Sequence, residues 1–209
     1  MGYRVKEAFY TLQGEGLAAG RASVFCRFTG CNLWSGRDAD RAKAACSFCD
    51  TDFVGTDGPG GGRFEAAQLA EHLMALWPGG GEPYLVFTGG EPMLQLDEAL
   101  IDACHAQGFE LAIETNGTKA VPPSVDWICV SPKPNSVLVQ ISGDELKLVF
   151  PQAAFPDPAV FEALDFGALL LQPLDDAHQA ANLAAATQYC LAHPRWRLSL
   201  QTHKLIGLP

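Results

Sequence analysis

Short apolar runs alternate along the chain with longer stretches whose apolar residues recur at helical spacing. The short runs predict strands, and the longer stretches predict helices. We expect strands over residues 3–12, 23–29, 84–87, 110–113, 127–130, 145–150, 168–171 and 197–200. We expect helices over residues 64–77, 96–106 and 177–192. This alternation predicts βα units that are joined into a parallel sheet.

The second predicted strand has two distinct faces. Val24, Cys26 and Phe28 share one face, and Arg27 lies on the other. A cysteine that alternates with valine and phenylalanine is typical of a small buried apolar residue. We therefore expect Cys26 in the core and Arg27 pointing into the interior of a barrel.

The connections between the predicted elements limit the architecture. Residues 116–126 and 131–144 lack a helical pattern, and the glycine-rich stretch 55–62 is expected to be a surface loop. A complete eight-stranded barrel needs about 200–250 residues, whereas this chain has 209 and spends many of them on loops. We predict an α/β fold, an incomplete and open TIM-like (β/α) barrel, as a single domain over residues 1–209.

Polar residues follow the carboxyl ends of six predicted strands. In a parallel barrel these ends meet at one mouth, which is where active sites form. We expect a site at this mouth that is built from Cys31, 89–91, 114–116, 131–133, Gln172 and 201–204.

Composition narrows the class of protein. A net charge of −10 argues against broad nucleic-acid binding, which needs a basic surface. The chain has no run of about 18 or more apolar residues, so we expect no membrane-spanning helix. The charged N-terminal segment lacks the apolar core of a signal peptide, and we expect a cytoplasmic protein.

The cysteines indicate a metal site. Seven cysteines, an odd number, fit reduced thiols better than a disulfide framework. Cys31, Cys46 and Cys49 lie in one loop with the spacing C-x14-C-x2-C. Three thiolates at this spacing suit an iron–sulfur cluster, but adding Cys26 would give four ligands for a structural zinc ion. Both readings stay open on spacing alone; Cys104, Cys129 and Cys190 are expected in the core.

A series of motifs runs in order over nearly the whole chain. It comprises YTLQGEG at 10–16, FCRFTGCNLW at 25–34, FCDTDF at 48–53, TGGEP at 88–92, ETNG at 114–117, SPK at 131–133, QP at 172–173 and QTHK at 201–204. With these motifs the chain resembles the radical S-adenosylmethionine (SAM) enzymes and, within them, the 7-carboxy-7-deazaguanine synthase family. Most of the superfamily has the spacing C-x3-C-x2-C, so the loop 31–51 is enlarged here.

The resemblance implies an activity and its cofactors. It implies a lyase that converts 6-carboxy-5,6,7,8-tetrahydropterin to 7-carboxy-7-deazaguanine with loss of ammonia, on the way to queuosine and other 7-deazapurines of tRNA. The implied cofactors are a [4Fe–4S] cluster, SAM and Mg²⁺. The implied partners are a flavodoxin or ferredoxin as reductant and a second copy of the chain in a homodimer, with no direct nucleic-acid contact.

The resemblance also assigns residues. Because the radical forms on SAM, it implies no catalytic side chain, although Lys133 is a candidate. The implied cluster ligands are Cys31, Cys46 and Cys49, and Thr51 is the implied Mg²⁺ ligand. The implied SAM contacts are Phe48, Cys49, Asp50, Gly90, Glu91, Ser131, Pro132, Lys133 and Gln172. The implied substrate contacts are Leu12, Gln13, Gly14, Glu15, Arg27, Thr88, His203 and the carboxylate of Pro209, in a C-terminal tail (201–209) that caps the substrate.

Some alternatives remain at this point. Glu114 and Asn116 fit a cap of a βα turn as well as they fit a site, and Asp52 fits the surface. His203 and Lys204 fit a solvated tail as well as a binding segment. The competing functions are an activase that installs a glycyl radical on another protein and a structural zinc-binding module.

Overall fold

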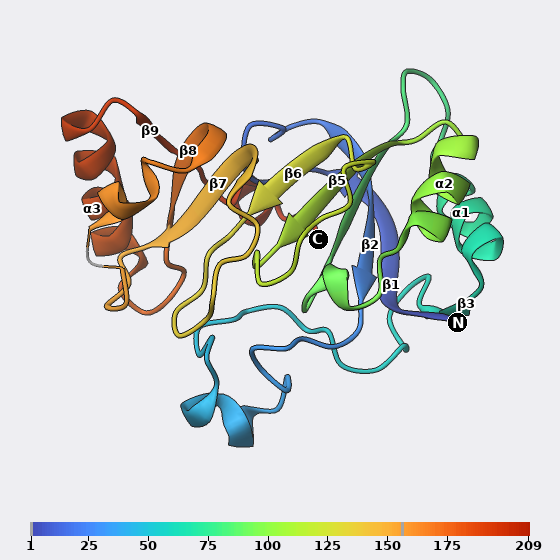
Figure 1. The fold of residues 1–209 in the computed structure, drawn as a ribbon, viewed down its shortest axis with the longest axis horizontal. Coiled ribbons are helices and arrows are strands. Elements are labelled where there is room, and N and C mark those ends of the chain that lie inside the picture. Colours follow the sequence, from blue (N-terminus) through green and yellow to red (C-terminus); the bar gives the residue numbers. More distant parts are fainter. Residues whose placement is uncertain (1, 156) are drawn as a thin grey trace.

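The computed structural model describes residues 2–155 and 157–209, so Met1 and Pro156 lie outside it. Its strands form one nine-stranded sheet with the order β3-β1-β2-β4-β5-β6-β7-β8-β9 (Figure 1). The pairs from β2 through β9 are parallel, whereas β1 is antiparallel to both β2 and β3. Within the described residues β9 does not pair with β3. The sheet is therefore open, which confirms the predicted incomplete barrel.

Most elements lie where the hydrophobic pattern predicts them. The strands are β1 (Tyr3–Leu12), β2 (Ala22–Phe28), β3 (Gly62–Phe64), β4 (Tyr84–Gly89), β5 (Glu110–Thr115), β6 (Trp127–Val130), β7 (Ser142–Phe150), β8 (Asp165–Pro173) and β9 (Trp196–Leu198). The α-helices are α1 (Ala66–Met74), α2 (Glu98–Ala106), α3 (Gln179–Ala192) and α4 (Thr202–Ile206), with 3₁₀ turns at Asp38–Lys43, Pro92–Leu94 and Pro158–Phe161.

The region around β3 corrects two predictions. The first helix begins at Ala66 and not at residue 64, because Glu65 caps it and closes a capping box with Gln68. Phe64 belongs to β3, which begins at Gly62, the last residue of the stretch 55–62 that the sequence predicts as a surface loop. That stretch pairs along β1, where Ala8 N donates to Pro59 O at 2.8 Å. Backbone hydrogen bonds made along an edge strand leave no apolar pattern, so the sequence does not reveal them.

Two further differences concern the C-terminal segment and the cluster loop. The last strand is shorter than predicted and ends at Leu198, and a short helix, α4, forms inside the C-terminal tail. The cluster loop 31–51 contains a 3₁₀ turn that the sequence does not predict. The connections 116–126 and 131–141 contain no helix, as predicted.

The helices cover the outer face of the sheet, and the inner face carries polar groups beside a small apolar cluster of Tyr84, Val86 and Ala112. One apolar cluster packs α1 and α2 against β1, β2, β4 and β5, and another packs α3 against β7 and β8 (Figure 1). Val24, Cys26 and Phe28 are all fully buried in the first cluster, as predicted. None of the helices in the described part of the chain is long and apolar enough to cross a membrane.

Candidate active site

The cluster loop is braced by its own side chains. Arg41 donates hydrogen bonds to the carbonyl oxygens of Ser47 (3.0 Å) and Cys49 (2.9 Å), and its guanidinium lies 4.1 Å from the ring centre of Trp34. Trp34 in turn packs edge-on against Phe53. These contacts tie the start of the loop to its end and hold Cys46 and Cys49 at the mouth of the barrel.

The thiols suit an iron–sulfur cluster better than zinc. Cys26 faces the apolar core on the opposite side of β2 from the site, so it cannot supply a fourth ligand. A zinc ion holds its thiolates at about 2.3 Å, which places the sulfurs roughly 3.8 Å apart. The sulfurs of Cys31, Cys46 and Cys49 do not all lie within 4.8 Å of one another in the described structure. Without Cys26 the loop offers three thiols, Cys31, Cys46 and Cys49, one fewer than a structural four-cysteine zinc site uses.

Burial affects the chemistry of these thiols. It raises the pKa of Cys31 and of Cys46, while backbone N–H groups at Leu33 and Trp34 oppose the effect at Cys31 and the Lys133 ammonium opposes it at Cys46. Cluster binding requires thiolates, so the iron replaces protons that the free protein holds firmly. Gly90 packs directly behind this site, because a Cβ there would lie 2.7 Å from Cys31 Cβ and 2.3 Å from the Gly30 carbonyl oxygen.

Two adjoining cavities occupy the mouth of the barrel. The first, about 190 Å³, reaches Cys46 and Cys49, and the second, about 290 Å³, reaches Pro209 at the chain's end. Each is at or below the lower end of the roughly 300–1,000 Å³ usual for small-molecule sites. They share a wall, so we treat them as two compartments of one site. The shared wall consists of Glu15, Asp50, Thr51, Thr88, Glu114 and Gln201.

Comparison with known proteins identifies the family. A model of the radical SAM superfamily matches residues 40–128. The chain is 63% identical to the 7-carboxy-7-deazaguanine synthase of Bordetella pertussis and 62% identical to that of Caulobacter vibrioides, in both cases over the whole of each protein. The chain belongs to the 7-carboxy-7-deazaguanine synthase family. The crystal structure of QueE from Escherichia coli, 26% identical, matches with a TM-score of 0.74 over 97% of this chain and 95% of that one.

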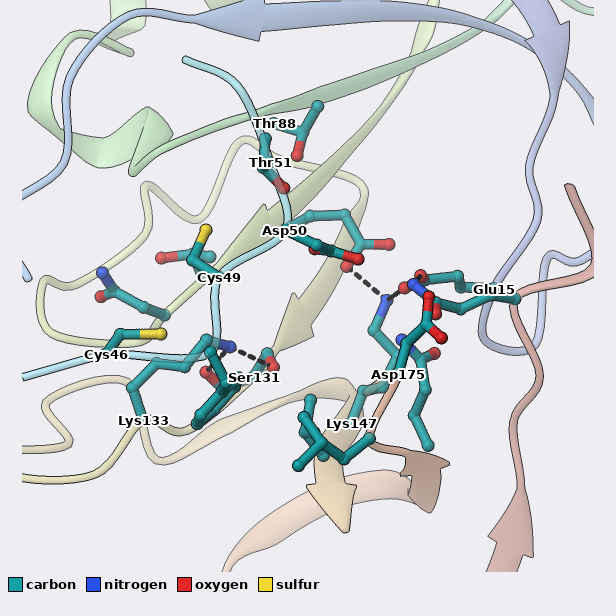
Figure 2. A pocket seen from close by; sticks show the side chains of 18 of the residues that line it. Glu15, Cys46, Cys49, Asp50, Thr51, Thr88, Ser131, Lys133, Lys147 and Asp175 are labelled. Atoms are coloured by element: carbon teal, nitrogen blue, oxygen red, sulfur yellow. Dashed lines mark hydrogen bonds and ion pairs between the residues drawn. The ribbon is translucent and has the colours of Figure 1, made fainter. Parts of the chain in front are cut away.

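The SAM contacts that the family resemblance implies lie mostly along the first cavity. Seven of the nine line it: Phe48, Cys49, Asp50, Gly90, Ser131, Lys133 and Gln172. Lys133 donates to the hydroxyl and the carbonyl oxygen of Ser131, and both side chains lie beside Cys46 (Figure 2). Pro132 is buried and does not line the cavity. The cavity thus joins the cysteines to the ends of β4, β6 and β8.

Glu91 is the clearest departure from the expected SAM set. It is completely buried and does not line either cavity. Its carboxylate accepts hydrogen bonds from Met93 N (2.9 Å), Thr115 Oγ1 (2.7 Å) and Asn116 N (2.8 Å). Burial raises the pKa of Glu91, and these donors oppose the rise. Glu91 therefore supports the wall formed by Thr115 and Asn116 from behind.

All eight substrate contacts implied by the family line the second cavity: Leu12, Gln13, Gly14, Glu15, Arg27, Thr88, His203 and Pro209. Arg27 points to this interior side of β2, as predicted, and pairs with Glu7 at 2.8 Å. The tail is anchored beside it, since Thr202 donates its N–H and its hydroxyl to the Gly14 carbonyl oxygen at 2.8 and 2.9 Å. Motifs that lie far apart in the chain thus meet along one cavity, and the substrate-binding roles of these residues stay a prediction.

The structure also places the residues for which the sequence allows two roles. Glu114 and Asn116 line the first cavity, so they do more than end a strand. Lys204 is not a solvated tail residue: its ammonium bonds Asp50 at 2.8 Å and Asp175 at 2.6 Å. Asp52, with a side chain 69% exposed, pairs with Lys6 and also borders the second cavity.

Lys147 is the main site residue that sequence reasoning missed. It lies in the apolar run of β7, and its side chain is only 4% exposed. Its ammonium bonds Glu15 at 2.6 Å and Glu114 at 2.7 Å, on the side of the site away from the cysteines (Figure 2). The sequence pattern that could have revealed it is a lysine between Leu146 and Leu148. This alternation places its charge on the face of β7 opposite to the two leucines.

The charges around Lys147 balance one another. Burial would raise the pKa of Glu15, but the Lys147 ammonium and further hydrogen bonds lower it to about 2. Burial likewise works against the charge of Lys147, yet Cys129, Glu114 and Glu15 raise its pKa well above the ordinary value. Glu114, Cys129 and Glu145 bring ligand atoms within 4.8 Å of one another. The ammonium already serves as the cation of this group, and we assign it no metal ion.

Proposed function

We propose that this chain is a radical SAM carbon–nitrogen lyase that forms 7-carboxy-7-deazaguanine from 6-carboxy-5,6,7,8-tetrahydropterin and releases ammonia. The observation that carries the proposal is the division of the mouth into two joined compartments. One compartment is bordered by two of the three cluster cysteines, Cys46 and Cys49, and the other by the carboxylates, amides and terminal residue of the family's substrate motifs. A radical formed in the first compartment would need to reach a ligand held in the second. The two compartments adjoin, because six residues line both of them.

The residues of the first compartment bind and orient the cofactors. Cys31, Cys46 and Cys49 would hold the [4Fe–4S] cluster, and Phe48, Ser131, Lys133 and Gln172 would hold SAM. When bound, the cluster supplies the electron that cleaves SAM to a 5′-deoxyadenosyl radical able to take a hydrogen atom from the substrate. The braced loop and the tail above it limit the access of water to that radical.

The residues of the second compartment recognise the pterin. Its 2-amino-4-oxo pyrimidine edge presents N–H donors and carbonyl acceptors, which suit the carboxylate of Glu15 and the amide of Gln13. Arg27 and the terminal carboxylate of Pro209 would fix the two ends of the ring system. Thr51 borders both compartments, and we propose that its hydroxyl helps to hold Mg²⁺, an oxygen-seeking ion, against the substrate carboxylate.

Further parts of the proposal concern the protein's surroundings. A single radical SAM domain over residues 1–209, with loop 31–51 as the cluster loop and tail 201–209 as the cap, would act in the cytoplasm as a homodimer. A flavodoxin or ferredoxin would supply the electron. The family's function does not require direct contact with nucleic acid, which agrees with the acidic chain.

One anaerobic experiment tests the function. The protein is purified without oxygen, its iron, sulfide and zinc are measured, and SAM, a chemical reductant and the carboxypterin are added. We expect about four irons and four sulfides per chain and formation of 7-carboxy-7-deazaguanine. SAM cleavage without deazaguanine would keep the radical chemistry and reject the substrate, which would favour the activase alternative. Zinc without iron would reject the proposal altogether.

A further inference from the structure

A buried lysine joins two carboxylates on the wall between the compartments. Lys147 bonds one oxygen of Glu15 and one oxygen of Glu114. The other oxygen of each carboxylate is held by an amide, from Gln201 at 2.9 Å for Glu15 and from Gln13 at 3.2 Å for Glu114. The five residues come from four separate segments of the chain, so the arrangement exists only in the folded barrel.

The carboxylates are more open to the ligand than the lysine, which lines the first cavity only. The side chain of Lys147 is 4% exposed, whereas those of Glu15 and Glu114 are 18% and 17% exposed and border both cavities. A carboxylate offers about four acceptor sites. Lys147 and one glutamine occupy two of these on each group. Each carboxylate therefore retains acceptor capacity toward the space that the ligand would fill.

Glu15 and Glu114 both bond the same ammonium, so without the lysine their two carboxylates would not both stay ionised. Like charges that share a buried site push a proton onto one of them. A protonated carboxyl donates a hydrogen bond, so it would turn a donor toward the N–H groups of a ligand that needs acceptors. The Lys147 ammonium removes this conflict, because it is the shared partner of both groups.

We propose that Lys147 is a positioning residue for substrate recognition: it holds Glu15 and Glu114 as a fixed pair of hydrogen-bond acceptors on the wall between the compartments. The pair selects a ring that presents N–H donors, such as the amino-pyrimidine edge of a pterin. This inference rests on the proposed function for the identity of the ring.

Other titratable groups face this network and belong in any test of its pH dependence. Cys129 and Glu145 lie behind it on β6 and β7, and burial raises the pKa of both. His203 on α4 lies near enough to Glu15 to help lower the pKa of its carboxyl. Because the Lys147 ammonium also lowers the pKa of Cys129 and of Glu145, the carboxyls of Glu15 and Glu114 are followed individually as well as through KM.

The test is the pH dependence of KM in Lys147→Met. We expect KM for the carboxypterin to rise about tenfold or more, as for the loss of a hydrogen bond to a charged group. The ratio of the variant's KM to that of the wild type should fall as the pH increases from about 6 to 8. At the lower pH one carboxyl is protonated, and raising the pH restores the acceptor. A folded, cluster-loaded variant with the wild-type KM at every pH would overturn the proposal.

A matched control separates recognition from stability. Arg21 forms an ion pair with Glu110, which lies on the same strand as Glu114 but at its opposite end. Arg21→Met should lower the thermal stability while its KM ratio stays near one and does not change with pH. A pH-dependent KM in this control as well would show that any lost ion pair produces the effect, and it would overturn the assignment.

A second variant keeps the test decisive if Lys147→Met does not fold. The double variant Lys147→Met/Glu15→Gln removes one charge of each sign, so Glu145, which is present in every variant, remains the carboxylate beside Glu114. We expect its KM to rise above that of the wild type and its KM ratio to be independent of pH. A double variant that binds the carboxypterin as tightly as the wild type would contradict the proposed role of the pair.

The inference can also be judged apart from the proposed function. If the wild type forms no deazaguanine, the function fails, and carbon-13 NMR of labelled glutamate carboxyls still reports on Lys147. We expect no titration of Glu15 between about pH 6 and 8 in the wild type and a new glutamate titration in Lys147→Met, with the signal assigned through Glu15→Gln and Glu114→Gln. The absence of a new titration in the variant would overturn the positioning role.

Discussion

Along each strand, one residue packs in the core and the next faces the site, because successive side chains point to opposite faces of the sheet. Cys26 is buried among apolar residues, and its neighbour Arg27 borders the substrate compartment. The same alternation buries Leu146 and Leu148 beneath α3 and sends Lys147 inward. Single substitutions at neighbouring positions should therefore have very different consequences.

Two cysteines separated by five positions test the identity of the metal. Cys31→Ala should reduce the iron content and abolish SAM cleavage, since a cluster ligand is lost. Cys26→Ala should retain about four irons per chain and lose about 1–3 kcal/mol of stability, as is usual for a buried substitution. Iron analysis and thermal denaturation of both variants give the answer. Equal loss of metal from the two variants would support a four-cysteine zinc site.

The buried Glu91 is predicted to be a structural residue. In Glu91→Gln one acceptor oxygen becomes an NH₂ group that faces N–H and O–H donors of the wall behind the site. We expect the free energy of unfolding to fall by about 1–3 kcal/mol, measured by denaturant titration. Glu98→Gln is the control, because Glu98 is exposed and, among the described residues, its side chain accepts a hydrogen bond from Ser124 alone. Equal stability of the two variants would contradict this account.

At the scale of elements, the short helix α4 connects three parts of the site. Thr202 binds the loop after β1, and Lys204 binds both Asp50 of the cluster loop and Asp175 after β8. Exposed ion pairs contribute only about 0–1 kcal/mol each. The anchoring of the tail therefore depends mainly on its close packing at Gly14, where backbone and side chain meet.

Gly14 allows the tail to close over the second compartment. A Cβ at this position would lie 2.0 Å from His203 Nδ1, so Gly14→Ala must displace His203 and the helix that carries it. We expect KM for the carboxypterin to rise about tenfold or more, while SAM cleavage in the absence of substrate is unchanged. Gly2→Ala is the control, because a Cβ at this position would have Phe64 O as its nearest neighbour, at 3.5 Å. A wild-type KM in Gly14→Ala would exclude His203 from substrate binding.

At the scale of the whole molecule, the site belongs to no single part of the chain. The nine-stranded sheet is covered by helices on its outer face, and the inner face with its mouth is left to ligands (Figure 1). The lining residues range from Glu7 to Pro209. Ligands that fill the mouth therefore link the two ends of the open sheet and should stabilise the entire fold.

Binding of SAM should raise the melting temperature of the cluster-loaded protein. A ligand at about one hundred times its Kd stabilises the native state by about 2.7 kcal/mol, which for a chain of this length corresponds to about 5–11 °C. Anaerobic calorimetry measures the shift. Cys31→Ala should show a smaller shift, because SAM loses the cluster as a binding partner. An equal shift in both proteins would show that SAM binds without the cluster.

The sequence predicted most of the strands and the open barrel, and most of the expected site residues line the two cavities, although their roles stay predictions. Apolar periodicity is a local property, so it locates most strands and helices directly. The motifs at strand ends also meet in space because parallel strands place these ends at one mouth. The predictions failed where long-range pairing decides the outcome: β3 forms only against β1, and α4 forms only where the tail meets Gly14.

Taken alone, the sequence determined which residues follow each strand, which face of β2 carries Cys26 and Arg27, and which three cysteines share a loop. Only the tertiary structure decided that Cys26 is turned away from the other thiols, that Glu91 supports the wall from behind, and that Lys147 joins Glu15 to Glu114. The physical reason is that burial and partner choice depend on residues brought together by the closing sheet. A motif specifies the kind of side chain, and the packing around it decides what that side chain can bind.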